Sequence, residues 1–190
     1  MRVITVPLAV LAVLAVLALV AAGCGSSGSS GAVNPNAKES SPPGDIPDNQ
    51  AYVAYAPPGA GYSVKVPEGW SRSKTGAAVS FTDKLNTVQL AERSGSARPT
   101  VATVRRTMLT QGVTPGSISV VGRTAGPAVR ITYLADSKPD AVTGKTRVDA
   151  VERYLFFHKG QEAVVTLSGP KGADNVDPWR IITDSLHWKR

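Results

Sequence analysis

The feature that most limits what this chain can fold into is an abrupt change of composition at Ala51. Residues 25–50 are rich in Gly, Ser and Pro and contain almost no large apolar side chains. Such a segment cannot offset its ordering entropy by burial, so residues 24–50 are predicted to be a disordered tether. Short, regular apolar patterns begin at Ala51, and residues 51–190 are therefore predicted to form one domain with a single sizeable core.

The amino-terminal segment has the pattern of an export signal. Arg2 is its only charged residue, and a nearly unbroken apolar stretch follows as far as Ala22. A charged start, an apolar centre and small residues at the end are typical of a secretory signal peptide, here predicted over residues 1–23. Cys24 is the only cysteine in the chain, which excludes an intramolecular disulfide and a cysteine-rich metal site.

Residues 21–24, Ala-Ala-Gly-Cys, resemble the bacterial lipobox, with the weakest match at Ala21, where Leu is commoner. The resemblance implies that the Cys24 thiol carries a diacylglycerol and that the chain is cut just before it. A lipid anchor would hold the domain on the extracytoplasmic face of the cell membrane. Two alternatives stay open: an uncleaved transmembrane anchor, since about 17–20 apolar residues can just span a bilayer, and a plain secreted protein.

The domain begins with patterns typical of strands. Tyr62, Val64 and Val66 alternate with polar residues, and residues 79–82 and 87–91 read as a hairpin. Four further strands are predicted in the segments SISVVGR, AGPAVRITYLAD, TRVDAVERYLFFHKG and EAVVTLSG. The segment 154–157 is apolar on both faces, so we expect it to be covered on both sides.

Two helices are predicted. Residues 99–112 contain an apolar stripe made of Val101, Val104, Met108 and Leu109. Thr100 suits the N-cap of this helix and Gly112 its end. In the second helix, near the carboxyl end, Asp177 is expected to cap and Pro178 to take the first position. Its apolar stripe consists of Trp179, Ile182 and Leu186.

Strands and helices do not alternate, which predicts an α+β domain with a largely antiparallel sheet flanked by two helices. The Pro-x-Gly-Trp turn at 67–70 and the Ser-Leu-x-Trp ending at 185–188 resemble the PsbP-like fold, which includes actinobacterial lipoproteins of the LpqN type. The resemblance covers residues 51–190 and implies an α/β/α sandwich that acts as an accessory partner. It transfers no catalytic residue, because that family shares none.

The chain offers few residues for catalysis. It has no Gly-x-Ser-x-Gly elbow, and its two histidines, His158 and His187, lack the spacing of metal ligands. Asp149 and Glu152 have opposite parity on one predicted strand, so they point to opposite faces and cannot form a carboxylate pair. We therefore expect a protein that is not an enzyme and that uses neither metal nor cofactor.

Two groups of basic residues remain as binding candidates. Lys138, Lys145 and Arg147 flank a long polar loop, and Arg105 and Arg106 lie off the apolar stripe of the first helix. An ordinary solvated surface is the favoured interpretation of each group, and binding is the alternative. Because the net charge of +7 resides in the folded part, an anionic surface, lipid or envelope protein is the expected partner, and nucleic acid is not.

The function predicted from these residues is a membrane-anchored, non-catalytic interaction module of the cell envelope. The alternative is a carrier of a lipid or other apolar ligand, with strand 154–157 and the helix stripes lining a pocket. A hydrolase that acts on envelope polymers is the least favoured reading.

Overall fold

The computed structural model describes residues 43–140 and 142–189. The predictions for the leader, for Cys24 and for most of the tether lie outside these residues. The elements are β1 Tyr52–Tyr55, β2 Tyr62–Pro67, β3 Ser71–Thr75, β4 Ala78–Asp83, β5 Asn86–Ser94, α1 Val101–Thr110, β6 Ser117–Arg123, β7 Gly126–Asp136, β8 Val148–His158, β9 Gln161–Pro170, α2 Val176–Asp184 and β10 His187–Trp188. Neither of the two helices within these described residues is long and apolar enough to cross a membrane.

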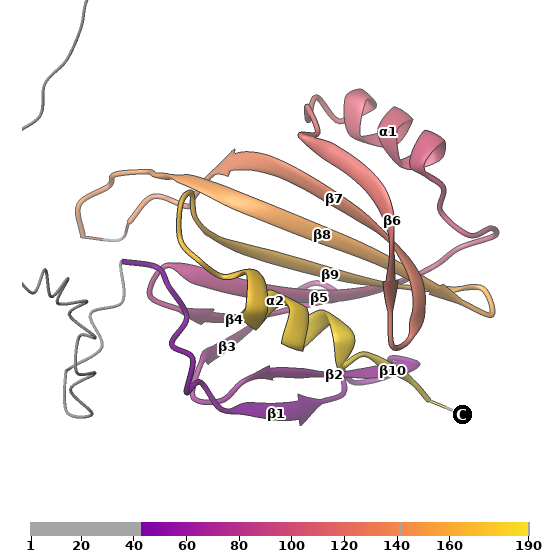
Figure 1. Ribbon diagram of the computed structural model, residues 1–190, viewed down its shortest axis with the longest axis horizontal. Coiled ribbons are helices and arrows are strands. Elements are labelled where there is room, and N and C mark those ends of the chain that lie inside the picture. Colours follow the sequence, from indigo (N-terminus) through magenta and orange to yellow (C-terminus); the bar gives the residue numbers. More distant parts are fainter. Residues whose placement is uncertain (1–42, 141, 190) are drawn as a thin grey trace, which may run out of the picture. The chain divides into compact units, whose positions relative to one another are not determined.

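The described strands form two antiparallel sheets. The larger has seven strands in the order β3-β4-β5-β9-β8-β7-β6, and the smaller has the order β1-β2-β10. Figure 1 shows β1, β2 and α2 on one side of the large sheet and α1 beside β6. The predicted α+β class, with an antiparallel sheet flanked by two helices, is confirmed.

The main core lies between the two sheets and α2. Tyr62, Val64 and Val66 of β2 are almost fully buried, as their alternation predicts. They pack with Tyr154 and Phe156 of β8 and with residues of the other central strands and of α2. We call the side of the large sheet that carries this core its first face.

A second, smaller core lies on the opposite face, beneath α1. Val104 and Met108 of the helix pack against Leu155 of β8 and Val129 and Ile131 of β7. Strand β8 therefore buries successive side chains on both sides of the sheet, which confirms the prediction from its two-faced apolar pattern. We call this side of the large sheet its second face.

Helix α1 begins and ends where the sequence predicts. Thr100 is the N-cap, and Thr100 and Thr103 form a reciprocal capping box. Gly112 follows the helix with a φ of 72°, a conformation that glycine adopts without strain. The predicted stripe was one residue too wide, because the side chain of Leu109 is 58% exposed. It lies too far around the helix to reach the sheet.

Helix α2 starts earlier than predicted. Its N-cap is Asn175, so Asp177 lies within the first turn and Pro178 occupies the third position. The side chain of Asn175 makes no capping bond because it is used elsewhere, accepting from the backbone N–H of Ile46. Trp179 and Ile182 of the predicted stripe are buried on α2, as predicted. Leu186 is also buried, but it follows the end of the helix at Asp184, so the prediction that it lies on the helix is wrong.

The domain also begins earlier than Ala51. Ile46 is 4% exposed and belongs to the main core, and the Asp45 carboxylate accepts a hydrogen bond from the backbone N–H of Asp174. The composition of residues 43–50 did not predict this, because the segment contains few apolar residues and only one of them, Ile46, is in the core. The prediction of a tether that extends to Gln50 is therefore wrong for these residues.

Candidate functional site

The strongest asymmetry of charge lies between β5 and β7. No Asp or Glu occurs between Glu92 and Asp136, whereas six arginines do, at positions 93, 98, 105, 106, 123 and 130. This stretch contains α1 and β6 entire. This stretch without acidic residues can be read from the sequence alone. Only two of its arginines, Arg105 and Arg106, were singled out from the sequence. Arg93, Arg98, Arg105 and Arg106 lie on α1, in the loop before it or at the end of β5, whereas Arg123 and Arg130 contact Tyr154 and Glu152 on the first face.

A pocket of about 400 Å³ lies between α1, the loop before it and the second face. The side chains of the second core, among them Met108 and Leu155, form its apolar base. Its charged lining residues are Arg93, Arg98, Arg153 and Glu162. We call this site the arginine pocket.

Each arginine of the pocket is held by a different contact. Arg93 forms an ion pair with Glu162, whose side chain is buried. The guanidinium of Arg98 lies 5.8 Å from the centre of the Phe157 ring. Arg153 donates from Nε to Thr166 Oγ1 across 3.2 Å and lies over the ring of Tyr133.

These contacts leave the pocket with an excess of positive charge. Three arginines line it, and the only carboxylate among its lining residues, that of Glu162, is engaged by Arg93. Contact with an aromatic ring restrains Arg98 and Arg153 without neutralising them. Planar guanidinium groups hold phosphate or carboxylate through paired hydrogen bonds, so the pocket suits an anionic group.

Arg105 and Arg106 are exposed on α1, off the buried stripe, where the sequence placed them. They do not line the arginine pocket. The two predicted basic groups do not meet either, because the β7–β8 loop lines a different pocket, in which α1 has no part. Arg93, Arg98 and Arg153 were not predicted as site residues, because their convergence depends on strand pairing between distant segments.

The β7–β8 loop borders a groove of about 480 Å³ on the same face. Its floor is lined with hydroxyl groups from neighbouring strands, including Ser80, Thr87 and Thr166. Lys138 and Arg147 line the groove, and Lys145 is exposed on the loop without being part of the lining. The groove contains as many acidic as basic lining residues: Asp136, Asp140 and Asp149 against Lys84, Lys138 and Arg147.

Two of the loop's charged residues have structural tasks. Asp140 accepts hydrogen bonds from the backbone N–H groups of Val142 and Thr143, which hold the pKa of its carboxyl below its usual range. Arg147 donates from Nη2 to the carbonyl of Leu85 across 2.7 Å, and its Nε lies 2.9 Å from Asp149 Oδ1. Arg147 therefore joins the loop to the β4–β5 turn, so it is not a free cation.

The carboxylates on β8 lie apart, as their parity predicts. Asp149 is buried beside Arg147, and its burial raises the pKa of the carboxyl more than the neighbouring guanidinium lowers it. Glu152 accepts a hydrogen bond from the Tyr154 hydroxyl. Burial and that carboxylate raise the pKa of Tyr154 above its usual value. This polar cluster lies against the main core.

The two histidines lie near the carboxyl end of the domain. The ring of His158 stacks on Trp188 with ring centres 5.4 Å apart, and His187 is exposed on β10. Within residues 43–140 and 142–189, no three side chains of His, Cys, Asp or Glu are grouped to hold a metal ion.

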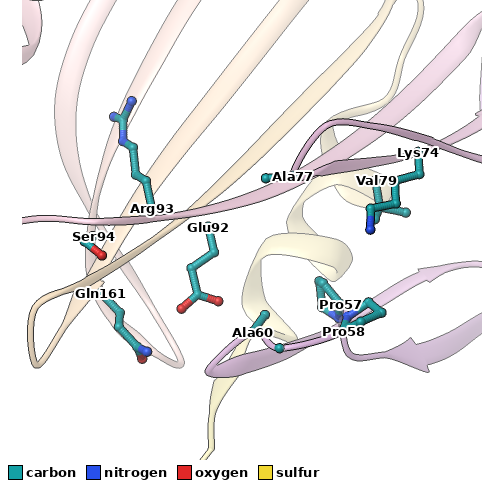
Figure 2. Close-up of a pocket in the computed structure, with 11 residues that line it drawn as sticks. Pro57, Pro58, Ala60, Lys74, Ala77, Val79, Glu92, Arg93, Ser94 and Gln161 are labelled. Carbon is teal, nitrogen blue, oxygen red and sulfur yellow. The ribbon is translucent and has the colours of Figure 1, made fainter.

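Another pocket opens between the β1–β2 loop and β5 (Figure 2). Figure 2 shows the carboxylate of Glu92 directed toward the turn that contains Pro57 and Ala60, with Arg93 directed away from it. Glu92 accepts a hydrogen bond of 2.9 Å from the backbone N–H of Gly61. This carboxylate therefore closes the loop onto the large sheet.

A shallow cleft of about 610 Å³ lies beside α2 on the first face. Trp179, Leu134 and Ala150 provide much of its apolar lining, and Glu152 is the one charged residue that lines it. The main core itself is well filled around β8, since Tyr154 and Phe156 are each 1% exposed. An apolar ligand would therefore occupy this surface cleft instead of a chamber beneath β8.

Comparison with known proteins gives distant structural likenesses. No family model and no curated protein matches this sequence. The solved structures similar to this chain include a cyanobacterial PsbP from Synechocystis sp. PCC 6803, with 13% identity, a TM-score of 0.49 and coverage of 73% of this chain and 93% of that one. Another is the yeast Ran-binding protein Mog1p from Saccharomyces cerevisiae, with 9% identity, a TM-score of 0.47 and coverage of 73% and 96%.

A third similar structure comes from Bacteroides thetaiotaomicron, with 13% identity and a TM-score of 0.48. The match covers 68% of this chain but only 46% of that one, so this chain spans about half the length of the Bacteroides protein. Because all three TM-scores lie below 0.5, we draw nothing about the function of this chain from them.

Proposed function

We propose that this chain is a lipid-anchored, extracytoplasmic module of the cell envelope that binds an anionic ligand in the arginine pocket and catalyses no reaction. The anchor is Cys24, on the resemblance of residues 21–24 to a lipobox. The resemblance of the Pro67–Trp70 turn and the Ser185–Trp188 ending to actinobacterial lipoproteins of the LpqN type agrees with this location.

The observation that supports the ligand class is the charge of the arginine pocket. Arg98 and Arg153 are both held in place by aromatic rings, and neither is paired with a carboxylate among the ion pairs of the described residues. An anion between them would gain charge-assisted hydrogen bonds without requiring large side-chain movements. Phosphate and carboxylate groups are the chemistry that this arrangement fits.

Titration with glycerol phosphate, followed by amide chemical shifts, tests the ligand. We expect shifts concentrated at the start of α1, at Arg98 and at Arg153, and we expect them to weaken as salt is added. The double variant Arg98→Ala and Arg153→Ala should lose most of this response. Arg72→Ala is the matched control, because Arg72 also lies over an aromatic ring, Tyr55, but does not line the arginine pocket. Equal binding by the double variant would overturn the proposal.

Cell fractionation tests the anchor. Cys24→Ala should move the protein from the membrane fraction to the soluble extracytoplasmic fraction and should abolish its labelling by a fatty-acid analogue. Retention of the variant in the membrane without label would favour the uncleaved transmembrane anchor. Release of both forms would favour a secreted protein.

A second candidate function is the binding of an apolar ligand in the cleft beside Trp179. The observation in its favour is the combination of Trp179, Leu134 and Ala150 around an open space of about 610 Å³. Native mass spectrometry of protein purified from its host should then show a bound apolar molecule, lost in Leu134→Asp. A ligand-free spectrum in the unaltered protein would contradict this function.

A further inference from the structure

The exposed surface of α1 combines basic and apolar side chains. Leu109 is 58% exposed and lies three positions after Arg106 and four after Arg105, so the three side chains are neighbours on the helix surface. Ala102 completes this stripe, four positions before Arg106. The helix contains no acidic residue.

Strand β6 extends the same surface. Its Val120 is 61% exposed and pairs with Val129, whose side chain belongs to the second core beneath α1. Val120 therefore projects from the second face, on the side that α1 covers. Figure 1 shows α1 and β6 next to each other at this end of the large sheet. We call the surface formed by Arg105, Arg106, Leu109 and Val120 the α1–β6 surface.

We infer that the α1–β6 surface contacts an anionic lipid bilayer. Lipid headgroups that carry negative charge attract arginines near the membrane surface, and exposed aliphatic side chains enter the boundary between headgroups and acyl chains. The surface offers both features, and no acidic residue between Glu92 and Asp136 opposes the attraction. The inference rests on the proposed function in one respect: the lipid on Cys24 keeps the domain near the bilayer.

The length of the chain permits this contact. Eighteen residues separate Cys24 from Pro43, where the described structure begins, and at full extension they reach about 60 Å. A domain of this size has a radius of gyration of about 15 Å. The reach of these eighteen residues exceeds twice the radius of gyration of the domain. The attachment at Pro43 therefore does not restrict which surface of the domain meets the membrane. Tethering raises the effective concentration of a weakly binding surface, so modest attraction is sufficient.

Vesicle sedimentation with the unlipidated chain, residues 25–190, tests the inference. Both core clusters are drawn from residues after Asp45, so this chain retains every core side chain. We expect it to sediment with vesicles of mixed phosphatidylglycerol and phosphatidylcholine, to stay in solution with phosphatidylcholine alone, and to dissociate at high salt. Arg105→Glu with Arg106→Glu should weaken binding by at least tenfold, since each arginine contributes about fivefold.

Two further variants test whether binding depends on the α1–β6 surface itself or only on the net charge of the domain. Leu109→Ser should weaken binding without altering the thermal unfolding of the domain, because the side chain is exposed. Arg72→Glu with Lys74→Glu on β3 is the matched control and should bind as the unaltered chain does, since β3 forms the opposite edge of the large sheet. An equal loss in the control pair would overturn the inference, as would equal binding to both kinds of vesicle.

The failure of this inference differs from failure of the proposed function. The variant Arg105→Glu with Arg106→Glu should still bind glycerol phosphate, because neither residue lines the arginine pocket. If vesicle binding were lost on replacing Arg98 and Arg153 but kept on replacing Arg105 and Arg106, the membrane would be contacted through the pocket. That result would overturn the α1–β6 surface while leaving an anion-binding module intact.

Discussion

The backbone N–H of Ile46 donates to Oδ1 of Asn175, 129 positions further along the chain, across 2.8 Å. The Asn175 amide also donates from Nδ2 to the carbonyl of Gly44 and to Oδ1 of Asn86, each across 3.0 Å. Asn86 in turn donates to the Gly44 carbonyl. Two buried side-chain amides thus join the start of the domain to the first residue of β5 and to the N-cap of α2.

Replacement of Asn175 should therefore destabilise the whole domain. Asn175→Ala leaves the Ile46 N–H and the side-chain Oδ1 of Asn86 without these partners in a buried site, and we expect a loss of about 2–3 kcal/mol in the free energy of unfolding. Urea denaturation followed by tryptophan fluorescence measures it. Asn49→Ala, at an exposed position of the same amino-terminal segment, should change stability by less than about 0.5 kcal/mol. Equal effects of the two variants would contradict this account.

Two adjacent residues of α1 should respond very differently to truncation. Met108 is 3% exposed and packs in the second core, so Met108→Ala should cost about 2–5 kcal/mol. Leu109 is 58% exposed, and Leu109→Ala should change the free energy of unfolding by less than about 0.5 kcal/mol. Chemical denaturation of both variants checks this. A large loss in Leu109→Ala would mean that its side chain is buried after all.

Sequence reasoning succeeded where burial follows a local period. Alternation predicted the buried side of β2, and the double-sided apolar run predicted that β8 is covered on both faces. Strand β3 was missed because all five of its residues are exposed and polar. A strand at the sheet edge can lack the apolar alternation from which a strand is predicted. Its existence depends on pairing with β4.

The site was less predictable because its parts come from distant segments. Arg153 enters the arginine pocket only through the pairing of β8 with β7 and β9. Arg147 was predicted as one of the basic residues that flank a candidate binding loop, but the Leu85 carbonyl to which it donates lies 62 positions earlier in the chain. The run without acids from Arg93 to Ala135 needed no structure to be seen. Only the structure shows that α1 and β6, which both belong to this run, lie next to each other and form one surface without acidic residues.

The pKa of Asp149 should depend on Arg147. Burial raises this pKa, and the guanidinium, 2.9 Å away, opposes the rise. In Arg147→Gln the opposing charge is gone, so we expect the pKa of Asp149 to rise further. A carboxyl NMR titration measures it directly. A lower pKa in the variant would contradict the assignment of these effects.

The same pair gives the sign of a pH effect on stability. Because the folded pKa of Asp149 lies above its unfolded value of about 3.9, the protonated form favours the fold. That contribution is fully present below the unfolded pKa and is lost as pH rises through the folded pKa. Arg147→Gln should therefore lose stability more steeply than the unaltered protein as pH rises above about 4. In Asp149→Asn with Arg147→Gln, this added steepness should be absent.

Arg123 ties the edge strand β6 to both α2 and β8. Its Nε donates to Thr183 Oγ1 across 3.0 Å, and its Nη2 donates to the Tyr154 hydroxyl across 3.2 Å. The guanidinium also lies over the Tyr154 ring, 5.2 Å from its centre. Arg123→Lys should lose about 1–3 kcal/mol of stability, because a single ammonium group cannot reproduce the two separated donors of the planar fork.

A double-mutant cycle of Arg123→Ala with Tyr154→Phe isolates this contact. We expect a coupling free energy of about 0.5–3 kcal/mol from urea denaturation, since the two groups touch and share one polar cluster. The cycle of Arg72→Ala with Tyr154→Phe is the control, and its effects should add within about 0.5 kcal/mol because Arg72 contacts Tyr55 instead. Additive effects in the Arg123 cycle would show that β6 is held at this edge by its pairing with β7 alone.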